Sequence, residues 1–246
     1  EIILKELYFS KTVNELSHFL NKKKKAIYYK ANILGLKRNL IDNNRKYSLN
    51  QKFFDIPNIN NSYWAGFILA DGYINPKTNL LDISLAIQDI VILETFNKTI
   101  NSNRPIYIRK KEPNDACYLR VNSKPIIQNL EQNWNIKTQK TWHFTPPNIQ
   151  DKQQILAFLI GCIDGDGWII RWQNNSFKLG LCGNLVFINW TKPILDDLIK
   201  ESGNVYKNTK CDIYNLEYTG QKGLQLKEKL LEVPLTFRLP RKWDIK

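Results

Sequence analysis

Two stretches of the chain place apolar and small residues at helical spacing and then break off at an acid and a glycine. They are residues 64–72, W-A-G-F-I-L-A-D-G, and residues 158–167, F-L-I-G-C-I-D-G-D-G. Each has small residues at positions i and i+4, which lie on one helix face and let two backbones approach closely. These are Gly66 and Ala70 in the first stretch and Gly161 and Gly165 in the second. The pattern predicts two helices that pack against each other through these positions.

The acid and glycine that close the two stretches are Asp71 with Gly72 and Asp166 with Gly167. A glycine here suits the left-handed position that ends many helices, so each Asp is predicted at a helix C-terminus. The macrodipole already makes that end negative, and two such ends side by side would repel each other. We therefore expect a cation between them. Mg²⁺ fits because it prefers one or two carboxylates together with water and phosphate oxygens.

Behind Gly72 the hydrophobic period changes from helical to alternating, which predicts strands. In the first half we expect strands at 73–75, 81–87, 105–109 and 117–122, a turn at 76–79, and helices at 89–100 and 125–134. In the second half we expect strands at 168–172, 178–182, 205–206 and 213–219, and helices at 192–202 and 223–231. The fold class is therefore α+β, with two pseudo-symmetric αββαββα halves. Each antiparallel sheet would pack one face on helices and leave the other face free.

The N-terminal segment predicts short helices. Thr12 to Glu15 form a capping-box pattern, after which apolar residues follow at helical spacing. A second helix carries Ile27, Ala31 and Leu34 on one face and ends at Gly35. Two short helices joined by a tight turn, the second rich in lysine, resemble a helix-turn-helix. The alternative is a Lys-rich helix that serves only solubility.

Polar residues dominate positions 39–59, with 43–46 as the expected linker, and Asn60, Asn61 and Ser62 are candidate caps for the first small-residue helix. We therefore divide the chain into residues 1–47, a helix-turn-helix-like segment with its linker, residues 48–150, the first half, and residues 151–246, the second half.

Composition indicates a polyanionic partner. The 246 residues include 36 Lys and Arg against 23 Asp and Glu, a net charge of +13. The mixture of cations with aromatic residues favours nucleic acid over a membrane surface, although a merely basic soluble protein remains an alternative. The four cysteines have no C-x-x-C spacing and there are only two histidines, which argues against a zinc site.

No run of about 18 apolar residues and no signal-peptide pattern is present, so we expect an intracellular protein with no membrane partner. The composition does not choose between a bacterial or phage-host cytoplasm and an organelle such as a mitochondrion or chloroplast.

With their spacing, the two stretches resemble the signature of the LAGLIDADG homing endonucleases, in the single-chain branch that carries two copies. The resemblance implies a β-saddle that binds double-stranded DNA, a monomer, and a staggered double-strand cut that leaves 3′ overhangs. It also implies one catalytic acid from each signature helix, here Asp71 and Asp166. The metal would lie at these acids and at the preceding Ala70 and Gly165. The cofactor would be Mg²⁺, with Mn²⁺ or Ca²⁺ as substitutes for binding.

The resemblance further implies a basic residue beside each scissile phosphate, for which Lys124 and Lys222 are the candidates after the fourth strand of each half. Polar residues near the end of the second strand help to organise water in the family, and Gln88 and Asn184 lie in that region. Asp164 occupies a variable position of the motif, and we do not assign it to catalysis.

DNA contacts are expected from cations and amides of the N-terminal helices and of the strands, since such side chains bind phosphates or base edges. The candidates are Lys23, Lys24, Lys25, Lys30, Lys37, Arg38, Lys77, Arg109, Lys111, Arg120, Arg171, Gln173 and Lys178. Two alternatives to the endonuclease stay open: an RNA maturase with intron RNA as partner, and a DNA-binding regulator that has lost cleavage. A further alternative is that the signature stretches are only buried helices with capping acids.

Overall fold

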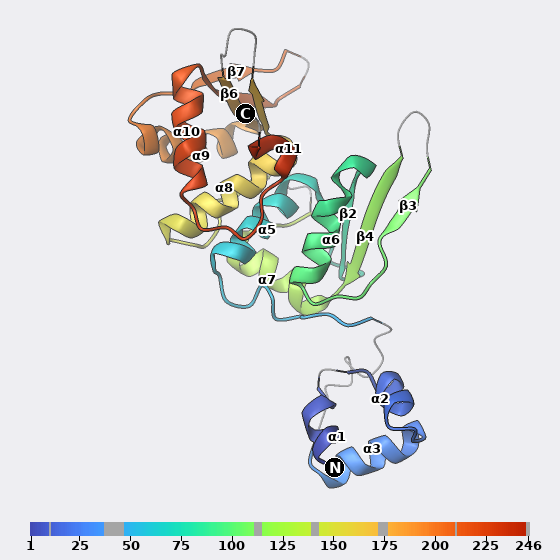
Figure 1. The fold of residues 1–246 in the computed structure, drawn as a ribbon. Coiled ribbons are helices and arrows are strands. Elements are labelled where there is room, and N and C mark those ends of the chain that lie inside the picture. Colours follow the sequence, from blue (N-terminus) through green and yellow to red (C-terminus); the bar gives the residue numbers. More distant parts are fainter. Residues whose placement is uncertain are drawn as a thin grey trace. The chain divides into compact units, whose positions relative to one another are not determined.

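The computed structural model in Figure 1 describes residues 1–9, 11–36, 47–110, 115–138, 143–171, 177–209 and 211–244. The chain divides into two compact units. One comprises Glu1–Asn50 and Asn97–Arg104, and the other comprises Gln51–Phe96 and Pro105–Lys246. The predicted domain boundaries at residues 47 and 150 stay predictions.

The described part of the first unit contains three short helices, α1 (Ile2–Leu7), α2 (Val13–Phe19) and α3 (Lys24–Ile33). The predicted capping box is present: the Glu15 N–H donates to Thr12 Oγ1 at 3.2 Å, and the Thr12 N–H donates to Glu15 Oε2 at 2.7 Å. Gly35 has a φ of +68°, the left-handed conformation expected after the end of α3. The helices share a small core, formed by Leu4, Tyr8, Val13, Leu16, Ile27 and Ala31.

The first signature half begins with α5 (Ile59–Asp71), which runs directly into strand β1 (Gly72–Asn75). The remaining elements are β2 (Leu80–Ala86), the 3₁₀ turn η1 (Ile87–Asp89), α6 (Ile90–Thr99), β3 (Tyr107–Arg109), β4 (Ala116–Asn122) and α7 (Lys124–Trp134). The strands form an antiparallel sheet in the order β1-β2-β4-β3.

The second half repeats this arrangement. It consists of α8 (Lys152–Asp166), β5 (Trp168–Arg171), β6 (Phe177–Gly183), α9 (Leu185–Ile199), β7 (Asn204–Lys207), β8 (Tyr214–Thr219), α10 (Gln221–Leu231) and α11 (Pro240–Trp243). Its sheet has the order β5-β6-β8-β7, which matches the first sheet strand by strand. The predicted α+β fold of two αββαββα halves is confirmed, and the structure adds the short helix α11, which the sequence patterns did not indicate.

Two predicted helix starts were wrong. Helix α5 begins earlier than expected, because the Asn58 side chain accepts from the Asn61 N–H at 3.0 Å and caps it. Helix α9 begins at Leu185 instead of residue 192, because Asn184 accepts from the Phe187 N–H at 2.9 Å. It ends before Lys200, whose φ of +56° leaves the helical region.

The explanation given for Gly72 and Gly167 was also wrong. Neither adopts the left-handed conformation: φ is −80° at Gly72 and −92° at Gly167, both extended backbone that continues into a strand. Glycine is required for space instead. A Cβ at Gly72 would lie 2.7 Å from the Ile68 carbonyl oxygen, and one at Gly167 would lie 2.7 Å from the Gly180 carbonyl oxygen.

Helices α5 and α8 lie side by side in Figure 1 and pack through the small residues, as predicted. A Cβ on Gly66 would overlap the carbonyl oxygen of Phe158, and a Cβ on Gly161 would lie 2.7 Å from the backbone nitrogen of Phe67. One on Gly165 would overlap the methyl group of Ala70. The two helices therefore contact each other backbone against backbone. Because Asp71 and Asp166 are their last residues, both acids lie at the same end of the helix pair.

Candidate active site

Asp71 and Asp166 are the last residues of α5 and α8. Asp71 is partly buried and Asp166 is exposed. A Cβ built on Gly165 would lie 3.1 Å from Asp71 Oδ2, so the Asp71 carboxylate rests against the last turn of the opposite helix. The close approach of α5 and α8 thus gathers two carboxylates at two adjoining helix C-termini.

The negative end of α8 is neutralised by Lys242 from α11. The Lys242 ammonium donates to the carbonyl oxygens of Ile163, Asp164 and Gly167, each at 2.7 Å, and approaches that of Gly165 at 3.1 Å. Burial lowers the pKa of Lys242 to about 8, while the charge of Asp164 and that of Asp71 act in the opposite direction. A cation of the chain itself therefore offsets the negative end of α8, while the metal expected between the two carboxylates stays a prediction.

Asp164 is buried and holds α11 in place. Its carboxylate accepts hydrogen bonds from the Tyr63 hydroxyl at 2.7 Å, the Leu239 N–H at 2.9 Å and Trp243 Nε1 at 2.6 Å. Burial raises the pKa of Asp164, and the hydrogen bonds from these three donors oppose that shift. Asp164 therefore anchors the segment that carries Lys242, which agrees with leaving it out of the catalytic set.

Two arginines of the same segment bind further elements. The Arg241 guanidinium forms two hydrogen bonds to the buried Asp89, Nε to Oδ1 at 2.7 Å and Nη2 to Oδ2 at 2.8 Å. Arg238 donates to carbonyl oxygens at the end of α10, including Leu230 at 3.1 Å. The sequence patterns had not pointed to Arg238, Arg241 or Lys242. The signal that could have found them is their density around Pro240, where R-L-P-R-K-W follows the last predicted helix.

Asn184 lies near the second acid, Asp166. It lines a cavity of about 170 Å³ with Asp166, Ala70, Cys182 and Phe187, among others. Gln88 is exposed in η1 beside Asp89, the partner of Arg241. Both residues follow the second strand of their half, as predicted.

Lys124 and Lys222 are not brought to the acids. Asn75 and Asn122 both pair with Leu80, so Lys124, two residues after Asn122, lies past the end of β1 that points away from Asp71. In the second half, Thr219 pairs with Lys178 and Lys222 follows it, whereas the Asp166 backbone contacts Cys182, four residues along β6. That separation is roughly 13 Å along the strand. The fourth strand leads away from the acids in both halves.

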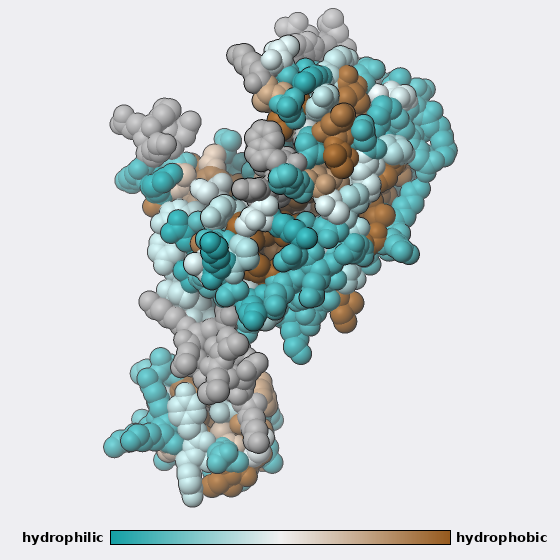
Figure 2. Space-filling view, turned by 180° about the vertical axis from the view of Figure 1, so that it is seen from behind, coloured by the Kyte–Doolittle hydropathy of each residue, from teal (hydrophilic) through white to brown (hydrophobic). Residues whose placement is uncertain are grey.

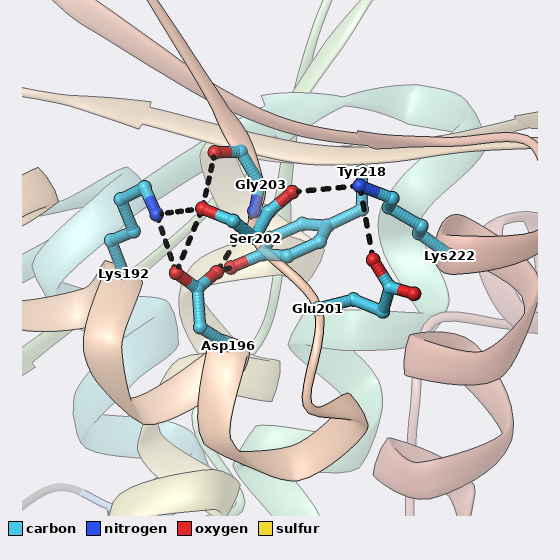
Figure 3. Close-up of polar contacts among 7 residues, drawn as sticks. All are labelled: Lys192, Asp196, Glu201, Ser202, Gly203, Tyr218 and Lys222. Atoms are coloured by element: carbon cyan, nitrogen blue, oxygen red, sulfur yellow. Dashed lines mark hydrogen bonds and ion pairs between the residues drawn. The ribbon is translucent and has the colours of Figure 1, made fainter.

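Figure 3 shows what Lys222 does instead. Its ammonium lies 3.2 Å from Glu201 and donates to the Ser202 carbonyl oxygen at 3.3 Å. In the same cluster, Asp196 accepts from the Gly203 N–H at 2.9 Å and the Tyr218 hydroxyl at 2.7 Å, and it also pairs with Lys192. The cluster fixes the connection from α9 to β7 against β8, so it is part of the scaffold of the second half.

The free faces of the two sheets are defined by the side chains that alternate with the buried ones. Arg109 and Arg120 lie on this face of the first sheet, and Lys178 lies on it in the second. Arg120 pairs with Asp82 at 2.7 Å, and Lys178 pairs with Glu217 at 2.7 Å. Arg171 is exposed, but it pairs in register with the buried Phe177, so the alternation puts it on the face of the sheet that carries the buried side chains, contrary to our expectation.

The remaining candidates lie elsewhere. Lys77 is exposed in the turn between β1 and β2, and Lys23, Lys24 and Lys25 are exposed at the start of α3. Lys30 forms an ion pair with Glu1. Lys37, Arg38, Lys111 and Gln173 lie outside the described residues.

The visible surface is mostly hydrophilic, with hydrophobic residues in separate groups (Figure 2). Within the described part of the chain, no helix has both the length and the apolar character needed to cross a membrane.

No protein-family model and no curated protein sequence matches the chain. Solved structures do. The I-LtrWI LAGLIDADG homing endonuclease bound to target DNA aligns over 77% of this chain and 86% of its own, with 12% identity and a TM-score of 0.51. The N-terminal LAGLIDADG domain of WhiA aligns over 80% and 87%, with 14% identity and a TM-score of 0.48. The meganuclease I-SmaMI bound to uncleaveable DNA aligns over 72% and 83%, with 12% identity and a TM-score of 0.45.

The likeness to I-LtrWI defines the class of fold. The two four-stranded antiparallel sheets and the paired helices α5 and α8 form the LAGLIDADG fold. At 12% identity the comparison with I-LtrWI establishes the fold and leaves the activity to be argued from the site.

The donors at the helix ends suit a hard divalent cation. Asp71 and Asp166 supply two carboxylates, and at least Asp166 is open to solvent, so water and phosphate oxygens could complete an octahedral shell. No cluster of three or more His, Cys, Asp or Glu side chains exists among the described residues. Mg²⁺ does not need one. The Gly165 carbonyl already accepts from Lys242, which makes it a weaker candidate ligand than the carboxylates.

Proposed function

We propose that the protein is a monomeric, site-specific DNA endonuclease that makes a staggered double-strand cut with 3′ overhangs in a long, asymmetric target. The observation that carries this proposal is the meeting of Asp71 and Asp166 at two adjoining helix ends, between two sheets that each leave one face free. One carboxylate for each half fits one hydrolytic event on each strand.

The roles of the residues follow from the geometry. The carboxylates of Asp71 and Asp166 would hold Mg²⁺, which supplies neutralisation of the developing phosphate charge and activation of water. Lys242 keeps the last turn of α8 in place through its four carbonyl contacts, and so holds Asp166 in position. Asn184 lines the cavity beside Asp166 and would orient water in the second half through its amide NH₂, since its oxygen accepts from the Phe187 N–H.

The net positive charge is concentrated in the N-terminal residues and not on the free faces of the sheets. Residues 1–47 contain 11 Lys and Arg against four Asp and Glu, a net +7 of the total +13. On the free faces of the sheets, by contrast, Arg120 and Lys178 are paired with acids. We infer that the N-terminal unit, as a helix-turn-helix-like module, supplies phosphate contacts beside the core, while the sheet faces read the bases.

A cleavage selection tests the proposal. The full chain is incubated with Mg²⁺ and a randomised double-stranded DNA library, and the cut ends are sequenced. We expect one family of long, non-palindromic targets cut with 3′ overhangs. A chain in which both Asp71 and Asp166 are replaced by Asn should give no cut ends. Equal cutting by that chain would refute the assignment of the site, and absence of cutting by the unaltered chain would refute the proposed function.

A further inference from the structure

A row of three side chains crosses the free face of the first sheet. Tyr73 on β1 pairs in register with Asp82 on β2, and Asp82 pairs with Arg120 on β4. The row begins one residue after the signature glycine Gly72 and two residues after Asp71. A side chain in this row would face a ligand bound to the free face of the first sheet, on the part of the sheet that follows Asp71.

Arg120 is held in this row by two contacts. Its Nε lies 2.7 Å from Asp82 Oδ2, and its guanidinium carbon lies 4.9 Å from the centre of the Tyr118 ring. Tyr118 in turn stacks on Tyr107, with ring centres 5.4 Å apart and planes at 17°. Asp82 is mostly covered, whereas the Arg120 side chain is 51% exposed. The contacts therefore fix the orientation of the guanidinium and leave its outer part accessible.

The part of Arg120 left accessible is the part that recognises guanine. Asp82 occupies Nε, and the two terminal nitrogens have no hydrogen-bond partner among the described residues. Two terminal N–H groups in a rigid plane match the O6 and N7 acceptors of guanine in the major groove. Because the orientation is set before binding, the side chain gives up less entropy when it meets the base.

The second half breaks this arrangement at the equivalent row. Trp168, one residue after the signature glycine Gly167, pairs with Gly180, and Gly180 pairs with Glu217. A Cβ on Gly180 would lie 2.5 Å from the Trp168 indole, so that ring covers the glycine. Glu217 occupies the place of Arg120 and pairs with Lys178 at 2.7 Å. The two halves thus present a fixed cation and a neutralised carboxylate at corresponding points.

Resting on the proposed DNA binding, we propose that Arg120 reads a guanine in the first half-site and that the corresponding position of the second half-site has no guanine preference. The target is then asymmetric at this pair of positions. Asp82 and Tyr118 act as positioning residues for Arg120.

The test is a binding selection with the full chain and a randomised DNA duplex, with Ca²⁺ in place of Mg²⁺. We expect a guanine at one position of the first half-site. Arg120→Gln should change that preference to adenine, since Gln pairs with adenine N6 and N7, by roughly tenfold or more. Asp82→Asn retains Arg120 but removes its charged support, so it should reduce the guanine preference while binding to random DNA is kept or strengthened.

Lys77→Gln serves as the matched control, because Lys77 lies in the exposed β1–β2 turn and should contact only phosphate. It should weaken binding to all sequences equally. If Arg120→Gln behaves as Lys77→Gln does, with every base preference unchanged, Arg120 is a phosphate contact and the inference is refuted. Guanine at both corresponding positions would also refute it. If the unaltered chain enriches no sequence, the proposed DNA recognition itself is refuted. Melting temperatures of all variants confirm that they remain folded.

Discussion

Gly161 and Tyr63 lie in direct backbone contact across the interface of α8 and α5: a Cβ on Gly161 would overlap the Tyr63 carbonyl oxygen. Gly66 has the reciprocal relation to Phe158. The interface consequently has no room for a methyl group at either glycine, and the position of both acids depends on it.

Gly161→Val should lower the melting temperature clearly. Overpacking costs about 1–3 kcal/mol where side chains can adjust, and here the obstacle is main chain, so we expect the upper part of that range or more. Gln153→Val is the control, because Gln153 is exposed on the same helix and the change sacrifices only helix propensity. Thermal unfolding of both variants measures the difference. An unchanged melting temperature for Gly161→Val would show that the helices do not meet there.

Asp71→Asn and Asp166→Asn should each abolish double-strand cutting. The amide keeps the size of the carboxylate but removes the charge that would hold Mg²⁺, while the faces proposed to bind DNA are untouched. Cleavage assays with excess protein, together with binding measured in Ca²⁺, separate the two effects. Full double-strand cutting by either variant is incompatible with the proposed site.

Lys242→Met should slow cleavage by roughly tenfold or more and leave DNA affinity nearly unchanged. A tenfold slower rate corresponds to about 1.4 kcal/mol of barrier, a modest share of what the hydrogen bonds from the Lys242 ammonium supply. Arg238→Met is the control, because Arg238 binds carbonyl oxygens at the end of α10 from the same segment. Both variants should be less stable, but only Lys242→Met should cleave more slowly at saturating protein. If Lys242→Met and Arg238→Met slow cleavage equally, Lys242 only stabilises the fold and does not position Asp166.

Removal of residues 1–46 should weaken DNA binding, flatten its salt dependence and shorten the footprint on one side only. Each phosphate that is no longer neutralised lowers the slope of log K against log salt by roughly 0.9. A tethered module also raises the effective concentration of the other one. Cleavage at saturating protein should persist. If footprint and salt slope match those of the full chain, the N-terminal helices are not a DNA-binding module.

Asp196→Asn should make the protein less stable at neutral pH and less sensitive to acid. Burial raises the pKa of Asp196, but hydrogen bonds from Lys192, Gly203 and Tyr218 outweigh it and hold the pKa below its ordinary value. A depressed carboxyl pKa stabilises the fold above the unfolded-state value near about 3.9, and this contribution disappears as the pH falls through the folded-state pKa.

We expect a decrease in stability on the order of 2 kcal/mol at pH 7 for Asp196→Asn, shrinking below about pH 4. Asp197→Asn is the control. Asp197 forms exposed ion pairs with Lys152 and Lys200, and such pairs contribute little to stability. Urea unfolding at several pH values measures both variants. A pH-independent difference between Asp196→Asn and the unaltered chain would contradict the argument.

The sequence predicted the structure correctly at positions where a single physical requirement limits the choice of residue. Small residues four positions apart predicted the α5–α8 contact, because only glycine and alanine fit between two backbones. Alternation predicted the strands to within a few residues, because one face of each sheet is buried. The boundaries of α5 and α9 were missed because capping by Asn58 and Asn184 depends on side-chain hydrogen bonds that many asparagines could form.

The cations of the site could not be placed from sequence. Lysine is abundant in this chain, and although Lys242 lies in the basic stretch R-L-P-R-K-W, that pattern does not say which element the lysine contacts. The difference arises from tertiary structure: Asp164, 78 positions before Lys242 in the chain, binds the backbone of Leu239 and the ring of Trp243 and so directs α11 onto the end of α8. The sheet register, also set by distant pairing, moves Lys124 and Lys222 away from the acids.

The reciprocal glycine contacts also bear on how the protein is made. Gly66 must find the Phe158 backbone, 92 positions later, and the Lys242 hydrogen bonds close only after 75 further residues beyond Gly167 have been added. During translation the apolar, glycine-lined face of α5 therefore stays uncovered until the second half has been synthesised. In that interval the ribosome-bound chain has one acid and no partner helix. Contacts this distant in sequence should make folding slow, and the end of α8 should gain its Lys242 contacts only once the α11 segment has emerged.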